Sequence, residues 1–381
     1  MIPYSKHTLY PEDVDSVTRV LNEEFLTQGE QVPLFEQAIC KYSGAHFGVA
    51  CNSGTSGLHI ACLAAGVTKG DLVWTVPNSF VASANCARYC GADVDFVDID
   101  PVTRNLCISA LEQKLYLAQQ RGRLPKVIIV VHFAGSSCDM ESIAKLTIPF
   151  GITLVEDAAH AFGGKDNKGN VVGACKYSQM CVLSFHPVKS ITSAEGGMVL
   201  TNDELLANRL FLYRSHGISR DPSTFQTERR DEPWFYAQHE LGFNYRLSDI
   251  HAVLGLAQLK HIDKFISARK NLAHRYHRLL ETVPIKKPEL DENSAWHLYV
   301  IELERHERKR VFAQLRERGV GVNVHYIPIH LHPYYRELGF SKGMFPNAER
   351  YYNEALTLPL YPSLTYDEQD HVVSQLQEIF L

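Results

Sequence analysis

The sequence contains no long apolar segment. Residues 1–10 are mixed in character, and no later stretch reaches the ~18 uninterrupted apolar residues of a membrane-spanning helix. We therefore expect a soluble, unexported protein that works in the cytoplasm. An excess of positive charge is also missing, because 38 Lys and Arg residues stand against 43 Asp and Glu residues, a formal net charge of −5. This balance excludes a global basic field that would attract nucleic acid or anionic lipid.

Metal-binding patterns are absent as well. The nine cysteines are scattered singly, without the close-spaced pairs of a structural zinc site, and the 18 histidines show no metal-ligand spacing. We interpret the cysteines as reduced, mostly buried thiols and expect no metal ion. No internal repeat or low-complexity segment is visible, which excludes repeat architectures.

What the chain does contain is ordinary globular composition over 381 residues, with 45% hydrophobic and 21% charged residues. Short apolar runs alternate with helical patterns from residue 47 to about residue 200, which is typical of a parallel sheet covered by helices. The pattern predicts an α/β fold, with strands at residues 47–51, 72–76, 94–97, 127–131, 152–156, 180–185 and 197–201.

The character of the sequence changes after Gly217, and a second unit begins near residue 248. Residues 219–232 are charged and polar, and whether they become ordered over a substrate is left open by the sequence. Beyond them, the pattern predicts a long helix over 248–280, a strand at 296–303, a helix at 309–318, a strand at 320–326 and a closing helix at 367–380. Two domains of ordinary size fit this length, and we place them at residues 1–247 and 248–381.

Ligands of open α/β sheets bind beyond the carboxyl ends of the strands, so the residues that follow each strand carry the functional signal. Residues 53–57 read Ser-Gly-Thr-Ser-Gly between a strand and a helix, a candidate phosphate-binding turn at a helix N-terminus. A turn that only caps the helix is the alternative interpretation. The segment lacks both the Lys of a nucleotide-triphosphate loop and the dinucleotide glycine fingerprint, which argues against a nicotinamide-dependent oxidoreductase.

Two further strand ends carry ionisable residues. Asp157 ends an apolar strand, where a carboxylate is able to hold a protonated pyridine nitrogen or simply to cap the next helix. Lys189 leaves a later strand within a mostly uncharged stretch, five positions after Ser184. A lysine desolvated in this way becomes a nucleophile, although a lone loop lysine is more often a solvated charge.

Several ordered motifs carry a resemblance to a known family. They are Glu-Asp-Ala-Ala-His-Ala at 156–161, Ser-Phe-His at 184–186 before Lys189, Ala-Glu-Gly-Gly at 194–197, Leu-Gly-Phe-Asn-Tyr-Arg at 241–246 and Ala-Trp-His-Leu at 295–298. From about residue 26 to the C-terminus the chain resembles the sugar aminotransferases, fold-type I enzymes that use pyridoxal 5′-phosphate (PLP). The resemblance implies an aspartate aminotransferase-like fold, with a mostly parallel sheet in a large domain and a smaller C-terminal α+β domain.

The resemblance also implies roles for individual residues. Lys189 would form the internal Schiff base with PLP, and Asp157 would pair with the pyridine nitrogen. His160 would approach the phenolic oxygen, and Phe80 would stack on the ring, where some relatives have Trp. The phosphate would be bound by Gly54, Thr55 and Ser184, and by Asn244 of the partner subunit, which makes a homodimer the working unit.

For the substrate, the resemblance implies a nucleotide-linked 4-keto-6-deoxy sugar as acceptor and glutamate as donor. The surroundings of His216 and of residues 324–330 favour the branch that aminates UDP-linked N-acetylated sugars in pseudaminic acid synthesis. The alternative is the branch that makes UDP-4-amino-4-deoxy-L-arabinose for lipid A modification. Substrate contact is the expected role of His216, His325, Tyr326 and His330, against the alternative of buried and satisfied polar groups.

Two other classes of protein fit the sequence less well. A protein that binds PLP or a nucleotide sugar without turnover, as a regulator, would not need both Lys189 and Asp157. The sugar dehydratases of the same family carry His where this chain has Lys189. Both alternatives are therefore disfavoured, and we expect a PLP-dependent nucleotide-sugar aminotransferase.

Overall fold

The computed structural model of the protein describes residues 1–224 and 232–381. Its centre is a seven-stranded sheet with the order β1-β7-β6-β5-β4-β2-β3, in which only β7 runs antiparallel to its neighbours. The predicted α/β fold with a mostly parallel sheet is confirmed. The strands are β1 (Phe47–Cys51), β2 (Leu72–Thr75), β3 (Asp93–Phe96), β4 (Val127–Val131), β5 (Thr153–Asp157), β6 (Met180–Ser184) and β7 (Gly197–Thr201).

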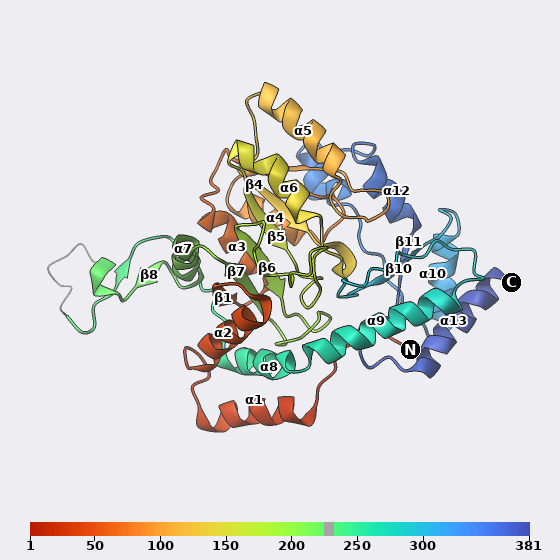
Figure 1. Ribbon diagram of the computed structural model, residues 1–381, viewed down its shortest axis with the longest axis horizontal. Helices are drawn as coiled ribbons and strands as arrows, with labels where there is room; N and C mark the ends of the chain where they lie inside the picture. Colours follow the sequence, from red (N-terminus) through yellow and green to blue (C-terminus); the bar gives the residue numbers. More distant parts are fainter. Residues whose placement is uncertain (225–231) are drawn as a thin grey trace.

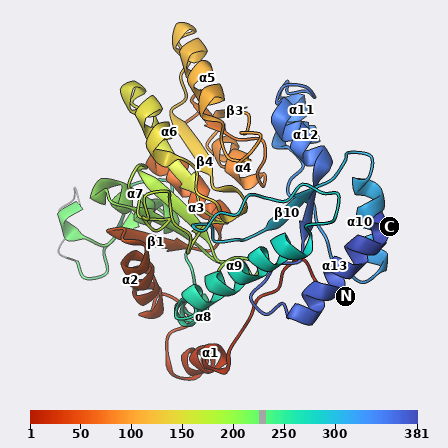
Figure 2. The same ribbon diagram turned by 45° about the vertical axis from the view of Figure 1, so that its right-hand side comes forward.

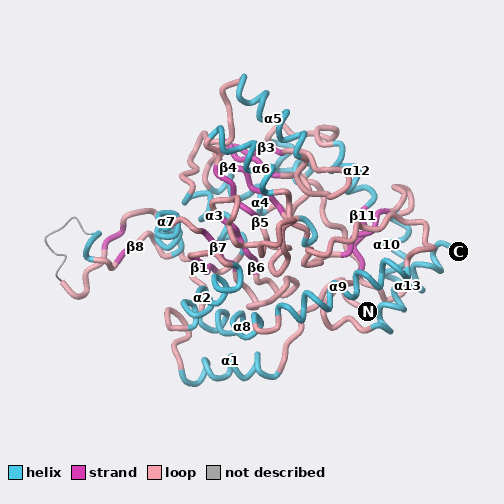
Figure 3. Tube along the Cα trace, in the orientation of Figure 1, coloured by secondary structure: helices cyan, strands magenta, loops and turns pink. Residues whose placement is uncertain are grey.

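Helices cover the sheet, whose strands gather in the middle of the molecule (Figure 3). Alternate residues of β1 and β7 enter different cores: Val49 and Val199 pack with α3 (Gly54–Ala64), whereas Ala50 and Met198 pack with α2 (Gln31–Ser43). This alternation follows from the period of two in a strand and explains why the strands are apolar on both faces. The remaining helices of this half are α1 (Pro11–Glu23), α4 (Ala82–Tyr89), α5 (Ile108–Gln120), α6 (Met140–Thr147) and α7 (Glu204–Arg214).

The expected helix over 248–280 is two helices, α8 (Asp249–Leu259) and α9 (Ile262–Leu279), separated at residues 260–261. α8 packs against α1 and α2, and α9 runs on to the C-terminal half (Figure 1). The domain boundary expected between residues 247 and 248 stays a prediction. α8 follows that boundary in the sequence, yet it packs against α1 and α2, which precede it.

The C-terminal half contains the small sheet of β10 (Tyr299–Glu302) and β11 (Ala355–Leu358), with α10 (Arg308–Glu317) and α13 (Tyr366–Phe380) beside it (Figure 2). The strand expected at 320–326 is not formed: Val320 and Asn323 make only isolated bridges, to Ile2 and Thr357 respectively. The N-terminus therefore packs on the C-terminal half. Two short helices, α11 (Pro333–Glu337) and α12 (Pro346–Glu354), complete this part.

A two-stranded arm projects from the body beyond α7 (Figure 1). It pairs β8 (Ile218–Ser219) with β9 (Ala237–Gln238). Residues 219–224 of the polar segment at 219–232 lie in this arm, and residues 225–231 fall outside the described part of the chain. Within the described residues, no helix is both long and apolar enough to cross a bilayer.

Candidate active site

A cavity of about 480 Å³ opens at the edge of the sheet where β5 and β6 end. Residues after β1, β2, β5 and β6 line it from the large sheet, and residues 323–326 line it from the C-terminal half. This is the edge at which open α/β sheets bind ligands. Of the residues expected from the sequence, the structure brings together Gly54, Thr55, Phe80, Asp157, His160, Ser184, Lys189, His325 and Tyr326.

Lys189 lies in the turn that follows β6, where its backbone N–H donates to the His186 carbonyl at 2.9 Å. Burial lowers the pKa of its amine to about 8, and the Asp157 carboxylate only partly offsets this effect, while the buried Arg269 cation adds to it. Because the charged form is disfavoured, a substantial part of the amine is neutral near pH 8. A neutral amine in a cavity is a competent nucleophile toward an aldehyde.

Asp157 is the last residue of β5 and is buried. Its Oδ2 accepts a hydrogen bond from the Ser83 hydroxyl at 2.6 Å, and its Oδ1 accepts one from the Ala159 backbone N–H at 3.2 Å. A carboxylate has about four acceptor positions, so lone pairs remain for a donor within the cavity. The chemistry of this site suits a cationic N–H partner.

His160 follows β5 and contacts the ring of His297 in a tilted arrangement, with ring centroids 4.2 Å apart. Its Nε2 lies 2.9 Å from the Tyr326 hydroxyl, whereas its buried Nδ1 has no hydrogen-bond partner among the described residues. Burial holds the pKa of His160 well below its usual range, and the charges of Lys189 and His325 act in the same direction. The imidazole is therefore neutral.

The N-terminus of α3 forms the floor of the cavity. Ser53 caps this helix, since its Oγ accepts the Ser56 backbone N–H at 3.1 Å. Gly54 is the first helical residue, and a Cβ added there would lie 3.0 Å from Cβ of Ser184. The turn thus caps the helix and also leaves its first N–H groups close to the cavity, where a helix dipole favours an anion.

These residues fit the cofactor implied by the resemblance. PLP needs an amine for its aldehyde, an acid partner for its ring nitrogen and donors for its phosphate, and Lys189, Asp157 and the start of α3 supply them around one cavity. The unpartnered Nδ1 of His160 is a further polar group that a ligand could satisfy. Phe80 lines an open side of the cavity; it is 59% exposed, and its ring centroid lies 6.4 Å from that of Tyr326.

Three of the expected residues do not line the cavity. His330 is completely buried and pairs through Nε2 with Oε1 of Glu349 at 2.9 Å, while its buried Nδ1 has no hydrogen-bond partner among the described residues. It lies in the interior and not at the cavity where substrate contact was expected. His216 and Asn244 are exposed near the base of the projecting arm. Neither reaches the cavity of its own chain.

Tyr4 and Asn323 also line the cavity, and sequence reasoning missed them. Tyr4 is held at the N-terminus because its carbonyl accepts the Leu360 backbone N–H at 3.0 Å, and its ring centroid lies 5.5 Å from that of His325. Neither residue belongs to a motif. Only packing of the N-terminal residues on the C-terminal half brings Tyr4 to the site.

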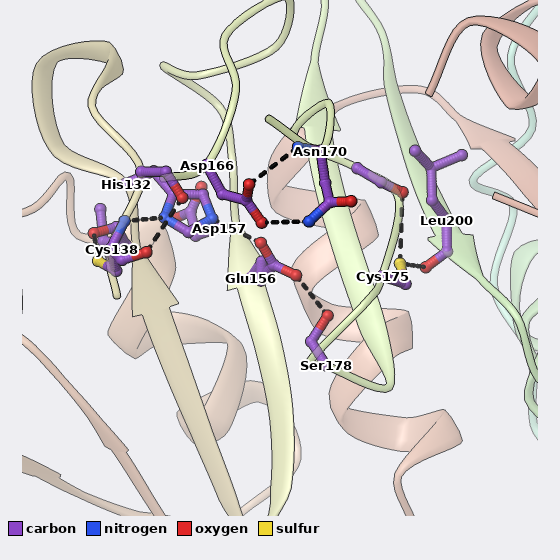
Figure 4. Close-up of polar contacts among 12 residues, drawn as sticks. His132, Cys138, Glu156, Asp157, Asp166, Asn170, Cys175, Ser178 and Leu200 are labelled. Carbon is purple, nitrogen blue, oxygen red and sulfur yellow. Dashed lines mark hydrogen bonds and ion pairs between the residues drawn. The ribbon is translucent and has the colours of Figure 1, made fainter. Parts of the chain in front are cut away.

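A second polar network lies beside the end of β5 (Figure 4). Glu156 accepts from the Ser178 hydroxyl at 2.5 Å and contacts Nε2 of His132 at 2.6 Å. The Cys138 backbone N–H donates to Nδ1 of His132, so the ring hydrogen is on Nε2 and points to Glu156. Neighbouring residues of a strand point to opposite faces, so this network supports β5 without entering the cavity.

The described residues contain no group of three or more His, Cys, Asp or Glu side chains arranged for a metal ion. All nine cysteines are free.

Comparison with known proteins gives a consistent result. Residues 8–377 match the model of the DegT/DnrJ/EryC1/StrS aminotransferase family. The chain is 35% identical over 386 residues to the UDP-4-amino-4,6-dideoxy-N-acetyl-beta-L-altrosamine transaminase of Campylobacter jejuni, covering 100% of this chain and 97% of that protein.

Solved structures agree. PseC of Helicobacter pylori, an aminotransferase involved in the biosynthesis of pseudaminic acid, superposes with a TM-score of 0.90 at 31% identity, covering 100% of this chain and 99% of the other. The sugar aminotransferase Spr1654 of Streptococcus pneumoniae, solved in PMP and PLP forms, gives TM-scores of 0.90 and 0.88 at 26% and 25% identity; the matches cover 100% and 99% of this chain and 99% and 98% of the other. The chain belongs to the DegT/DnrJ/EryC1/StrS aminotransferase family and is a PLP-dependent sugar aminotransferase.

Proposed function

We propose that the protein transfers the amino group of glutamate to C4 of a UDP-linked, N-acetylated 4-keto-6-deoxy hexose, in the pathway to pseudaminic acid. The observation that carries the proposal is that Lys189 and Asp157 line one cavity in a chain that matches the Helicobacter pylori enzyme over its whole length. Glutamate leaves as 2-oxoglutarate, and the sugar ketone becomes an amine.

When bound, PLP supplies an aldehyde that carries the amino group and a ring that delocalises the electron pair released at the substrate carbon. Lys189 would hold the cofactor and, when displaced by the amino donor, move a proton between the substrate carbon and the cofactor. Its lowered pKa suits this exchange, because a general base works best near the operating pH. Asp157 would keep the ring nitrogen protonated by a charge-assisted hydrogen bond.

The other cavity residues orient the ligands. The first turn of α3, with Thr55 and Ser184, would bind the phosphate, His160 would contact the phenolic oxygen, and Phe80 would cover the ring. Burial lowers the pKa of His325 to about 4, so His325 would meet the sugar as a neutral imidazole beside the Tyr326 phenol.

We propose that two identical subunits share each site. Asn244 is exposed and does not line the cavity of its own chain, which supports the expectation that it reaches the phosphate of the partner subunit. His216 lies close to Asn244 in the fold, since the His216 backbone N–H donates to the Phe243 carbonyl at 2.8 Å. We place His216 at the same shared site, as a substrate contact.

A panel of UDP- and dTDP-linked keto sugars tests this function. Each is offered to one purified preparation with L-glutamate, 2-oxoglutarate is measured and the amino sugar is identified by mass spectrometry. We expect turnover of the UDP-linked N-acetylated 4-keto-6-deoxy hexose. Preference for the UDP-linked 4-keto pentose would assign the protein to the arabinose branch instead, and turnover of no nucleotide sugar in the panel would refute the proposed substrate class.

A further inference from the structure

A chain of two serine hydroxyls ends on the Asp157 carboxylate. Ser83, the second residue of α4, places its Oγ 2.6 Å from Oδ2 of Asp157, and the Oγ of Ser79 lies 2.7 Å from that of Ser83. All three residues are buried, with 1% of Ser83, 4% of Ser79 and 7% of Asp157 exposed. Ser79 lines the cavity next to Phe80, whereas Ser83 does not line it.

When the Asp157 carboxylate is ionised, the two serine hydroxyl hydrogens can point in only one direction each. A hydroxyl carries a single hydrogen, and a carboxylate only accepts. The Ser83 hydrogen is therefore directed to Asp157, which leaves the Ser83 oxygen to accept the hydrogen of Ser79. Consecutive hydrogen bonds polarise one another, so the hydrogen bond from Ser79 strengthens the one that Ser83 donates to Asp157.

The chain also fixes the orientation of the carboxylate. One oxygen is held by Ser83 and the other by the backbone N–H of Ala159, so the side chain is anchored from α4 and from the residues after β5. Rotation of the carboxylate would break one of these bonds in a buried setting, where an unmade hydrogen bond is costly. The remaining lone pairs therefore keep one direction relative to the cavity.

We propose that Ser83, supported by Ser79, is a positioning residue that holds the Asp157 carboxylate toward the ring nitrogen of the bound cofactor. The inference rests on the role proposed for Asp157, but it does not depend on which sugar is the substrate. Ser83 touches neither substrate nor reacting atoms, and it acts through the orientation of Asp157.

The neighbouring carboxylate provides a matched control. Ser178 donates to Glu156 at 2.5 Å, a serine–carboxylate pair one residue away along β5 that lies outside the cavity. Ser178→Ala removes the same hydroxyl from a buried carboxylate and so measures the purely structural cost. A readout that moves in Ser83→Ala and not in Ser178→Ala belongs to the cofactor site.

The experiment compares Ser83→Ala, Ser79→Ala, the double variant, Ser178→Ala and Asp157→Asn. For each protein, the apo-form melting temperature, the PLP dissociation constant and the pH midpoint of the visible absorbance of bound cofactor are measured. We expect Ser83→Ala to weaken PLP binding about tenfold, the loss of one hydrogen bond to a charged group, and to shift the absorbance midpoint. Ser178→Ala should leave both values as in the wild type.

The double variant tests whether Ser79 acts through its hydrogen bond to Ser83 or independently of it. If Ser79 acts through Ser83, Ser79→Ala weakens PLP binding less than Ser83→Ala does, and adding it to Ser83→Ala has no further effect. Should Ser83→Ala fail to fold, Ser83→Cys, which keeps a side chain of similar shape with only a weak donor, takes its place in the comparison with Ser178→Ala.

Equal PLP affinity and equal absorbance midpoints in Ser83→Ala and Ser178→Ala would overturn the inference. Wild-type behaviour of Asp157→Asn would instead overturn the proposed role of Asp157. An inactive wild-type protein that still binds PLP would count against the proposed substrate alone, because none of these readouts uses a sugar.

Discussion

The hydroxyl of Tyr326 lies 2.9 Å from Nε2 of His160, so a residue of the C-terminal half is bonded to one that directly follows β5. Burial raises the pKa of the Tyr326 phenol, and burial also lowers the pKa of the His160 imidazole. Both groups are therefore neutral and share a hydrogen bond of the ordinary kind. This contact joins the two halves of the molecule across the cavity.

Removal of the Tyr326 hydroxyl should destabilise the protein. In Tyr326→Phe the buried Nε2 of His160 has no partner, which lowers the free energy of unfolding by about 1–3 kcal/mol. Tyr351→Phe is the matched control, because the Tyr351 hydroxyl is buried without a hydrogen-bond partner among the described residues. Its loss should be neutral or stabilising. Urea denaturation of both variants makes the comparison, and an equal change in the two would contradict the assigned contact.

Replacement of Lys189 should remove both covalent capture and turnover. Lys189→Ala takes an amine out of the cavity and should lower the rate about a thousandfold or more, the scale of losing a nucleophile and acid–base group. Borohydride reduction followed by digestion and peptide mapping should label Lys189 in the wild type and nothing in the variant. Lys165→Ala, at an exposed lysine, is the control. A pyridoxyl label on another residue would overturn the assignment.

The capture of PLP by the apo-protein should depend on pH through the amine of Lys189. Its pKa is lowered to about 8 by burial, so the reactive neutral form grows about tenfold per pH unit below that value and saturates above it. An amine of ordinary pKa would instead keep gaining reactivity up to about pH 10.4. Stopped-flow absorbance from pH 6 to pH 10 distinguishes the two curves. Absence of a plateau above pH 9 would show that the amine is not desolvated.

Mixing two inactive variants should restore activity if subunits share sites. A mixed dimer of Lys189→Ala and Asn244→Ala contains one site with both residues intact, because each site takes Asn244 from the partner chain. Random exchange of subunits should then recover about a quarter of the wild-type activity in a two-fold symmetric dimer. The rate is measured after exchange in mild denaturant. No recovery, with exchange verified by mass spectrometry, would place both residues in one chain.

Much of the site could be predicted because its key residues sit next to strands. The end of an apolar run marks the carboxyl edge of the sheet, so Asp157 and Ser184 are identified by position as well as by motif. The glycine and hydroxyl residues at 53–57 mark the start of α3 in the same way. These signals depend only on residues close together in the sequence, so the hydrophobic pattern is enough to locate them.

The errors arise where long-range packing decides the structure. Residues 320–326 look like a strand, yet they form only two isolated bridges, one to Ile2 and one to Thr357, so their backbone pairs with two different segments and builds no continuous ladder. His330 looks like its neighbours His325 and Tyr326, but Glu349 on α12 binds it in the interior. The helix pattern over 248–280 does not reveal its break at residues 260–261.

Hydrophobic periodicity was enough to indicate the alternation of strands and helices and the α/β fold, and the motifs at the strand ends carried the resemblance that implies PLP. The hydrogen bonds from Ser83 to Asp157 and between Tyr326 and His160 became visible only in the folded chain, because these partners are separated by 74 and 166 positions. The physical reason is that hydrophobic periodicity depends on near neighbours along the chain. Hydrogen bonds between distant residues depend on how the helices pack on the sheet, and no local pattern records that packing.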